Sequence, residues 1–387
     1  MISIAFLAPA VRPPVLHPSR TFQHRHQNFP TATTSTPRRF ASIVGLPFRE
    51  LVSPQELPWD ALSGRSLAVD GYNAIYQFLA TIRQRDGMPF TDPEGHPTSH
   101  LIGVFYRTSS LLSQGVLPVW VFDGRPPDLK AGTIRSRILA KERAEAQWSE
   151  ALAAGDLETA RKKAAQTSRL TRSMVEEVRE LLTALGVPSV QAPSEGEAQA
   201  ATMAARGSVW AAASEDYDSL LFGAPRLVRG LAARGRAGQS PGAQLVNRDD
   251  LLSQLGVSGD ELILIGILVG TDFNDGAKGI GPKRALKLVQ EHLGWEATLM
   301  KAGLDPKEVE PVAELFRHPA VEATAAPYFG PVDEAAVERI LVEGHGFSPD
   351  RVKAAVARAR KRPVVTSSPA DARARQTLLE TYGGPDP

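Results

Sequence analysis

Acidic side chains recur in this chain directly after short apolar runs, where buried strands would end. Four such runs, SLAV, VWVF, SVQA and WAAA, each lead into one or two carboxylates, and one more acid follows the apolar stretch LILIGILVG. Because the carboxyl ends of parallel strands meet at one edge of a sheet, these side chains are expected to converge. The set is Asp70, Asp123, Glu195, Glu197, Asp216, Asp218 and Asp272.

Converging carboxylates in this number are suited to hold metal ions. Taken singly, each has an ordinary explanation: Asp216 and Asp218 could lie in a solvated turn, and Ser194 with Glu197 matches a capping box. Together they repel one another, and cations relieve that repulsion. In a chain without cysteine or suitably spaced histidines, oxygen ligands favour Mg²⁺ or Mn²⁺. Two ions about 4 Å apart would suit phosphodiester hydrolysis.

The segment GAKGIGPKRALKLVQEH carries a second pattern. Gly279 and Gly281 flank one apolar residue, and Lys283 and Arg284 stand at the start of an amphipathic helix. A tight glycine turn at a helix start lets backbone N–H groups approach a phosphate, as in a helix-hairpin-helix. We expect this element to bind the DNA backbone without reading the base sequence.

Basic residues concentrate in the polar insertion 128–171. Its part from 130 to 175 holds ten Lys or Arg and five Asp or Glu, although the whole chain has a formal net charge of +1. Such a stretch can be a solvated helical hairpin, but beside a metal site its cations could bind the scissile phosphate or line a passage for a single strand. The residues that follow closely on Asp123 are Lys130, Arg135, Arg137, Lys141 and Arg143.

Short apolar runs alternate with helical periodicity from residue 66 onward. This alternation is typical of an α/β fold whose central sheet is mostly parallel and covered by helices on both faces. The insertion 128–171 would form exposed helices after the second strand. We predict strands at 66–70, 117–124, 188–192 and 208–213, and helices at 72–85, 99–113, 172–186 and from 194, with further helices to about 295.

The composition allows one large domain or two ordinary ones, with 42% apolar residues among 387 and no apolar run of transmembrane length. Residues 1–43 differ from the rest, since they are rich in Pro, Ser, Thr, His and Arg, and the first acid of the chain is Glu50. They could be a transit peptide, a disordered tail or sequence translated from a misplaced start.

Together the motifs resemble the flap endonuclease family, particularly its archaeal members. The resemblance covers residues 45 to about 295 and implies a PIN-like 5′ nuclease fold with an inserted helical arch and a helix-hairpin-helix. It rests on AVDGYNAIYQFLATIRQRDG, TSHLIGVFYRT, VWVFDGRPPDLK, QAPSEGEAQAA, AASEDYDSLLFGAPRLVR and ILVGTDFN with KGIGPKRAL.

The activity that this resemblance implies is Mg²⁺-dependent cleavage of branched DNA. Such an enzyme removes 5′ flaps and degrades 5′ ends at junctions of Okazaki fragment maturation and base excision repair, leaving a 5′-phosphate. Two alternatives stay open: another nuclease on the same scaffold, of RNase or excision-repair type, and a non-catalytic protein that binds junctions or a clamp. The compact arch and the complete set of seven acids favour the flap endonuclease.

Roles for individual residues follow from the same resemblance. The seven acids match the family's metal ligands, Glu215 has no ligand counterpart, and Lys130 and Arg137 match arch residues directed at the scissile phosphate. Tyr76 matches an aromatic residue that stacks near the cleavage site. The hairpin at Gly279–Gly281 matches an element that grips duplex DNA, often with a monovalent cation such as K⁺. Residues at family positions that contact DNA are Arg83, Thr98 and Arg107.

Members of the family commonly end in a motif that binds the sliding clamp (PCNA), Gln-x-x-aliphatic-x-x-aromatic-aromatic. QTLLETYG supplies Gln376, Leu379 and Tyr382, but Gly383 stands where the second aromatic is usual. We therefore expect either weak clamp binding or a frayed tail. The further expectations are a monomer, no contact with membranes, and a place at the nucleoid in the cytoplasm of an archaeal cell.

The resemblance also divides the chain into regions. Asp70 lies 25 positions after Gly45, as in relatives whose second residue is that glycine, so we expect translation to begin at the Val44 codon. A tryptic peptide from within residues 1–38 in a cell extract would contradict this. The regions are an unmatched extension (1–43), an N-terminal nuclease region (44–141), an arch or connecting region (142–158), an internal nuclease region (159–295) with the helix-hairpin-helix (271–292), a C-terminal helical region (296–365) and a flexible tail (366–387) with the degenerate motif (376–383).

Overall fold

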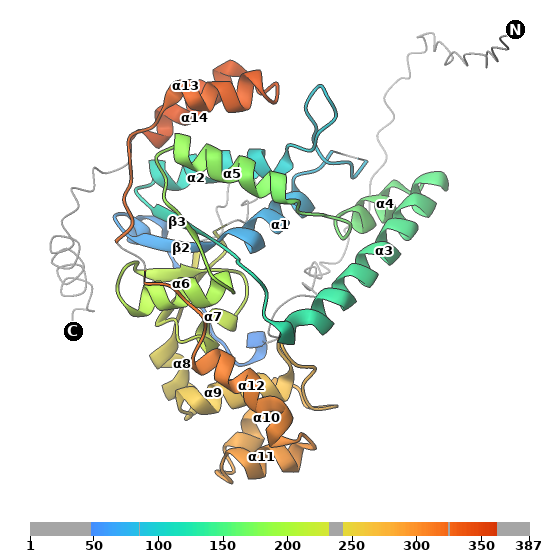
Figure 1. The fold of residues 1–387 in the computed structure, drawn as a ribbon, viewed down its shortest axis with the longest axis vertical. Helices are drawn as coiled ribbons and strands as arrows, with labels where there is room; N and C mark the ends of the chain where they lie inside the picture. Colours follow the sequence, from blue (N-terminus) through green and yellow to red (C-terminus); the bar gives the residue numbers. More distant parts are fainter. Residues whose placement is uncertain (1–47, 85, 232–242, 324–325, 362–387) are drawn as a thin grey trace, which may run out of the picture. The chain divides into compact units, whose positions relative to one another are not determined.

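A mixed sheet of seven strands runs through the protein (Figure 1). The computed structural model describes residues 48–84, 86–231, 243–323 and 326–361, which belong to the unit formed by residues 43–387. The order of the strands across the sheet is β1-β7-β6-β5-β2-β3-β4. Their bounds are β1 Gln55–Leu57, β2 Ser66–Asp70, β3 Leu117–Phe122, β4 Ser189–Gln191, β5 Ala211–Ala213, β6 Arg226–Arg229 and β7 Ala243–Asn247.

The five strands from β6 to β4 are parallel, as the alternation of strands and helices predicts. Val69 of β2 lies opposite Ala213 of β5 and Trp120 of β3, so these strands end at one level. The carboxyl ends of β2, β3 and β5 therefore meet at one edge, where Asp70 ends β2, Asp123 follows β3, and Asp216 and Asp218 follow β5.

Helices cover both faces of the sheet because its strands are apolar on both sides. Leu67 and Val69 pack against one hydrophobic core with α1, α2, α5 and α14, while Ala68 packs into the other with α6, α9 and α12. Figure 1 shows these two groups above and below β2 and β3. The α-helices are α1 Gly71–Thr81, α2 Ser99–Ser113, α3 Ala131–Ala153, α4 Leu157–Ala164, α5 Arg172–Ala184, α6 Gly196–Ala205, α7 Asp218–Leu221, α8 Arg248–Leu255, α9 Gly259–Val269, α10 Pro282–Val289, α11 Trp295–Ala302, α12 Pro306–Arg317, α13 Glu334–Glu338 and α14 Pro349–Ala359.

The insertion after β3 is a helical hairpin, as predicted. A short 3₁₀ turn, Asp128–Lys130, leads into α3, and α4 packs back against α3. Only Ala144 and Ala151 of α3 are buried, so the hairpin is largely exposed, and Figure 1 shows it projecting from the sheet. The expected arch region 142–158 begins inside α3, so residue 142 marks no structural break.

Two features of the described chain differ from the prediction. We expected only helices between residue 213 and about 295, but β6 and β7 form an antiparallel pair there, and β1 pairs with β7. The strands β1, β6 and β7 are three to five residues long and contain polar residues, so they give little apolar periodicity in the sequence. The extension 1–43 and the tail 366–387 lie outside the described residues.

Helices α8 and α9 lead from β7 to the expected helix-hairpin-helix (271–292). Helix α9 begins with a capping box formed by Ser258 and Glu261, ends at Gly270, and packs against α10. In the described ranges no single helix is long and apolar enough to span a bilayer. Helices α8 and α9 reach that length only as a pair bent by 78°.

Candidate active site

The first two acids lie at the ends of the central parallel strands. Asp70 is the last residue of β2 and caps α1, because its Oδ1 accepts a hydrogen bond from the backbone N–H of Asn73 at 3.0 Å. Asp123 follows β3, and its Oδ1 accepts from the backbone N–H of Gly196 at 2.7 Å. Since β2 and β3 are neighbours in the sheet, both carboxylates come to the same edge.

Glu195 and Glu197 come from the start of α6. Glu195 occupies the N-cap without a side-chain cap bond, and the carboxylate of Glu197 instead accepts a hydrogen bond from the hydroxyl of Ser214 at 2.7 Å. The interpretation of Ser194 and Glu197 as a capping box is therefore wrong, because a partner 17 residues away in sequence has taken the glutamate.

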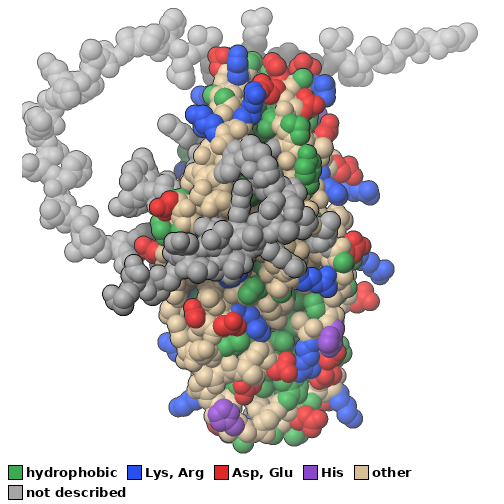
Figure 2. Space-filling view, turned by 90° about the vertical axis from the view of Figure 1, so that its left-hand side faces the viewer, with side chains coloured by type: hydrophobic (Ala, Val, Ile, Leu, Met, Phe, Trp, Pro, Cys, Tyr) green, Lys and Arg blue, Asp and Glu red, His purple; other side chains and the backbone are tan. Residues whose placement is uncertain are grey.

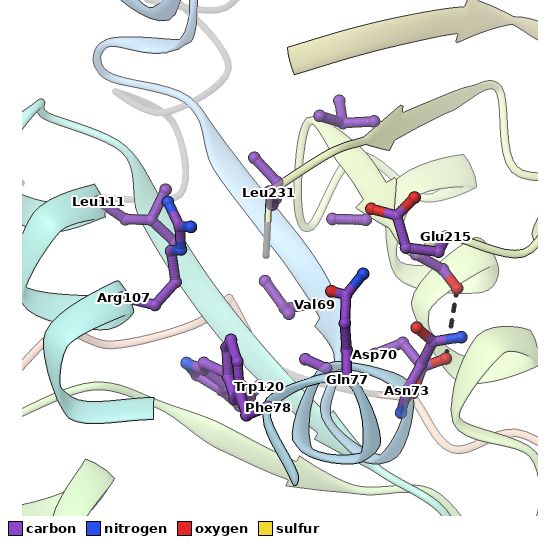
Figure 3. A pocket seen from close by; sticks show the side chains of 14 residues that line it. Val69, Asp70, Asn73, Gln77, Phe78, Arg107, Leu111, Trp120, Glu215 and Leu231 are labelled. Carbon is purple, nitrogen blue, oxygen red and sulfur yellow. Dashed lines mark hydrogen bonds between the residues drawn. The ribbon is translucent and has the colours of Figure 1, made fainter. Parts of the chain in front are cut away.

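The three acids of SEDYD separate in space. Asp216 accepts a hydrogen bond from the side-chain amide of Asn73 at 2.9 Å, and Asp218 is buried at the start of α7. Glu215 accepts from the backbone N–H of Gly230 at 2.7 Å and approaches Arg229 at 3.7 Å. Figure 3 shows Glu215 lining a pocket beside Asp70 and Asn73. Glu215 is thus held by Arg229 and Gly230 at the end of β6, and its lack of a ligand role stays a prediction.

The base of the arch reaches into the same site. The ammonium of Lys130 lies 2.5 Å from Glu195 Oε2 and 3.4 Å from Asp272 Oδ2, and the Arg137 guanidinium donates to both oxygens of Asp272 at 2.6 and 2.8 Å. The hydroxyl of Thr133 donates to the backbone carbonyl of Asp272 at 2.8 Å. Two of the seven acids therefore face cations of the arch, although the sequence suggested no basic partner for them.

Burial and mutual repulsion perturb the remaining acids. Burial raises the pKa of Asp70 and of Asp123 to about 6 and that of Asp218 to about 7. The pKa values of Glu197 and Asp216 are also raised, first by burial and then by neighbouring carboxylates. These carboxylates carry charge that the described protein groups do not fully compensate.

The donor set fits divalent metal ions. All seven ligating groups would be carboxylate oxygens, which Mg²⁺ and Mn²⁺ prefer, and Asp218 Oδ1 is buried without a hydrogen-bond partner among the described residues. As the side chains stand, no three acids or histidines of the described residues form a ready-made ligand group. Glu195 and Asp272 face the arch cations, so these two side chains would have to turn toward an ion.

The chain is similar to known proteins both in sequence and in fold. An XPG N-terminal domain matches residues 48–144 and an XPG I-region matches residues 186–272. Flap endonuclease 1 of Aeropyrum pernix is 47% identical over 333 residues, covering 82% of this chain and 95% of that protein. The chain belongs to the flap endonuclease family.

The fold is also that of a solved structure from this family. The flap endonuclease-1 of Methanococcus jannaschii is 40% identical and superposes with a TM-score of 0.65 over 82% of this chain and 98% of that one. The catalytic core of Rad2 in complex with a DNA substrate has a TM-score of 0.63 over 81% of this chain and 99% of that chain, at 22% identity, which extends the likeness of fold alone. The PIN-like nuclease fold is thereby confirmed.

The residues expected to contact DNA differ in their surroundings. Tyr76 is 37% exposed on α1, and the ammonium of Lys141 lies 4.7 Å from the centre of its ring. Arg107 lines the pocket of Figure 3. Thr98 is buried at the N-cap of α2, with 3% of its surface exposed, so its hydroxyl is not presented to solvent.

Arg83, also expected to contact DNA, is engaged within the protein. Its guanidinium donates hydrogen bonds at 2.8 Å to the carbonyls of Leu79 and Gly87 and to the hydroxyl of Ser168. It ties the end of α1 to the chain returning from the arch. A role of Arg83 at the DNA stays a prediction.

The glycine hairpin of this flap endonuclease-family chain is open toward solvent. Gly279 has φ +76°, which favours glycine, and a Cβ at Gly279 or Gly281 would meet nothing within 4 Å. Gly281 is the N-cap of α10, whose first turn holds Lys283 and Arg284. Backbone N–H groups at this helix start are thus free of side-chain caps, as a phosphate site needs.

Sequence reasoning missed Asn73 and Ser214, which contact the acids directly. Nothing local marks Asn73, since its partner Asp216 is 143 residues away. Ser214 stands beside the acids in SEDYD, and this adjacency was its only signal. The clamp-motif residues Gln376, Leu379 and Tyr382 lie outside the described residues.

Proposed function

We propose that this protein is a structure-specific 5′-flap endonuclease with 5′–3′ exonuclease activity. Its substrate would be branched DNA, cut at the base of the 5′ flap during Okazaki fragment maturation and base excision repair. The observation that carries the proposal is the convergence of the seven acids with Lys130 and Arg137 of the arch, in a chain whose relatives are named flap endonuclease 1.

Two Mg²⁺ ions, or Mn²⁺ in their place, would be held by the seven carboxylates. When bound, such ions polarise the phosphate and stabilise charge on the oxygens of an in-line displacement. The reaction breaks the P–O3′ bond and adds the oxygen of water to phosphorus, leaving a 3′-hydroxyl and a 5′-phosphate. The acids would supply the negative charge that attracts cations. The strand ends would hold these acids in place.

The arch cations would act on the phosphate itself. Lys130 is largely buried and within 3.4 Å of two acids, so it is already inside the site rather than on its rim. Burial lowers the pKa of Lys130, but its ion pairs with Glu195 and Asp272 outweigh burial and raise the pKa above the usual value. The ammonium therefore stays charged at every physiological pH and can stabilise charge on a phosphate.

The hairpin at Gly279–Gly281 would hold the duplex while the arch engages the flap. Its open backbone and the adjacent Lys283 and Arg284 suit contacts to phosphates, which position DNA without reading its sequence. A K⁺ ion could take part through hairpin carbonyls. Such work on chromosomal DNA would place the protein, as a monomer, at the nucleoid in the cytoplasm.

The decisive experiment uses end-labelled 5′-flap, 3′-flap, blunt duplex and 5′-flap RNA substrates, each with and without Mg²⁺. The proposal requires cleavage near the base of the 5′-DNA flap, dependent on the ion and faster than on the other substrates. Binding of the junction without cleavage under any divalent ion would favour the non-catalytic alternative. Preference for the RNA flap would favour a ribonuclease on the same scaffold.

A sliding clamp is the proposed protein partner, bound weakly through Gln376, Leu379 and Tyr382. With Gly383 in place of a second aromatic residue, the apolar anchor is smaller than usual, and the segment loses conformational entropy on binding. Calorimetric titration of a peptide of residues 370–387 into the clamp of the same organism should give a dissociation constant in the micromolar range. The absence of heat at high micromolar peptide would contradict it.

A further inference from the structure

Two uncharged side chains join three of the seven acids. The hydroxyl of Ser214 lies 2.7 Å from Glu197 Oε1 and 3.3 Å from Asp70 Oδ2, and it accepts a hydrogen bond from the backbone N–H of Asp216 at 3.1 Å. The amide of Asn73 donates to Asp216 Oδ2 at 2.9 Å. The backbone N–H of Asn73 also donates a hydrogen bond to Asp70 Oδ1 at 3.0 Å.

These contacts come from three separate elements. Asn73 belongs to α1, Ser214 follows β5, and Glu197 lies in the first turn of α6. Ser214 is 8% exposed, so its hydroxyl is withdrawn from solvent. A hydroxyl has one proton, and the shorter contact indicates that Ser214 donates it to Glu197 while Asp70 lies within reach.

The two residues differ from the arch cations in one physical respect. Lys130 and Arg137 bring positive charge to Glu195 and Asp272, which offsets the charge that would attract an ion. Asn73 and Ser214 orient carboxylates by dipoles alone and leave their negative charge in place. Neutral donors that hold ligating carboxylates typically affect metal affinity by about 10- to 100-fold.

We propose that Asn73 and Ser214 are positioning residues that set the metal affinity of this site by fixing Asp70, Glu197 and Asp216 relative to one another. The inference rests on the proposed metal-dependent function, because it assigns the three acids to ion binding. Without these donors the acids repel one another and turn apart, so an ion must reassemble them at a cost in binding free energy.

The test is calorimetric titration of Mn²⁺ into the full-length protein without DNA. Ser214→Ala should weaken binding about 10-fold, and Ser214→Thr, which keeps the hydroxyl, should stay within about threefold of the parent. Asn73→Ala should weaken binding about 3- to 10-fold, since it loses the amide but keeps the backbone bond to Asp70. Gln77→Ala is the matched control, because Gln77 projects from the same helix without a hydrogen bond to an acid, and it should bind as the parent does.

Each outcome of these titrations supports or overturns the positioning role of Asn73 and Ser214. Parent-like affinity in Ser214→Ala and Asn73→Ala, or equal loss in Ser214→Thr and Ser214→Ala, overturns the inference. Circular dichroism melting identifies a misfolded variant, and if Ser214→Ala fails to fold, Asn73→Ala alone carries the test. A parent that binds Mn²⁺ with this pattern of variants but cuts no flap would contradict the proposed function and leave the positioning role standing.

Discussion

Neighbouring acids in the stretch SEDYD have different partners in the structure. Asp216 lies among the acids and is held by Asn73, while its neighbour Glu215 turns to the N–H of Gly230 and to Arg229. The two adjacent carboxylates differ because the chain bends between β5 and α7, so that one faces Asn73 of α1 and the other the end of β6. This pair provides a matched test of the metal site.

We predict that Asp216→Ala abolishes cleavage and spares binding of the junction. Loss of one ligand disturbs the ions, which contribute several kcal/mol to the transition state, so the single-turnover rate should fall at least about 100-fold. Phosphate contacts elsewhere should keep the dissociation constant within about threefold. Glu215→Gln, the control, should cleave at nearly the parental rate. Asp216→Ala activity within about tenfold of the parent would refute the ligand assignment.

Among the elements, the arch does more than cover the site, since its base is bonded to the acids through Lys130, Thr133 and Arg137. The pairs link α3 to the segment after α9, 135 residues away for Arg137. In the absence of ions these cations therefore occupy carboxylate oxygens that ions would use. These cations have two proposed tasks: they neutralise acids of the ion-free site, and they stabilise charge on the phosphate. Their removal should therefore lower the cleavage rate but not the affinity for a divalent ion.

For Lys130→Ala and Arg137→Ala we expect the single-turnover rate to fall about 10²- to 10³-fold, with junction affinity changed far less, because these groups stabilise charge in the transition state. Mn²⁺ should bind the free variants at least as tightly as the parent, since Glu195 and Asp272 lose a competing cation. Arg169→Ala is the control on the same arch, where the guanidinium pairs with Glu145 outside the site. A change of affinity alone would make Lys130 and Arg137 simple tethers.

The hairpin before α10 gives a prediction about the backbone. At Gly281, φ is −93° and a methyl group would meet nothing within 4 Å, so Gly281→Ala should leave the melting temperature within about 2 °C of the parent. The same methyl would stand between the helix start and a phosphate, and duplex affinity in fluorescence anisotropy should fall about 3- to 10-fold. An unchanged affinity would exclude the hairpin from the DNA interface.

At the scale of the whole molecule, the concentration of acids at one sheet edge sets the response of stability to pH and ions. The face drawn in Figure 2 carries interspersed acidic and basic side chains, whereas the sheet edge brings together seven acids, two of which face Lys130 and Arg137. Burial raises the pKa of Asp218 from 3.8 to about 7 and that of Asp70 and Asp123 to about 6. The folded, ion-free protein thus keeps protons that the unfolded chain has lost.

These raised pKa values make the folded protein less stable as the pH rises. Because the folded state binds more protons between about pH 4 and pH 7, these groups lower the free energy of unfolding as the pH rises through that window. We expect the melting temperature of the ion-free protein to be several degrees higher at pH 5.5 than at pH 7.5. In Asp218→Asn, which lacks one of these titrating carboxyl groups, this difference should be smaller. Mg²⁺ should raise the melting temperature more at pH 7.5, where protons compete less. An identical pH dependence in parent and variant would contradict this.

Much of this protein could be inferred from the sequence because its signals are local. A strand of five or six apolar residues followed by an acid identifies itself, and the parallel order of such strands obliges their ends to meet. The strands at 66–70 and 117–122 and the convergence of Asp70 with Asp123 follow from that rule, while the runs predicted at 188–192 and 208–213 contain the shorter strands 189–191 and 211–213. The glycine hairpin can likewise be recognised from a few consecutive residues.

Other features were decided only by the tertiary structure, because they join residues far apart in the chain. The strands β6 (RLVR) and β7 (AQLVN) interrupt their apolar residues with polar ones and give no clear strand signal, and their antiparallel pairing stabilises them. Arg83 has three hydrogen-bond acceptors, one of them 85 residues away, and Asn73 finds Asp216 only when α1 packs beside the end of β5. Residue type sets what a side chain can bind, but the packing of helices on the sheet selects its partner.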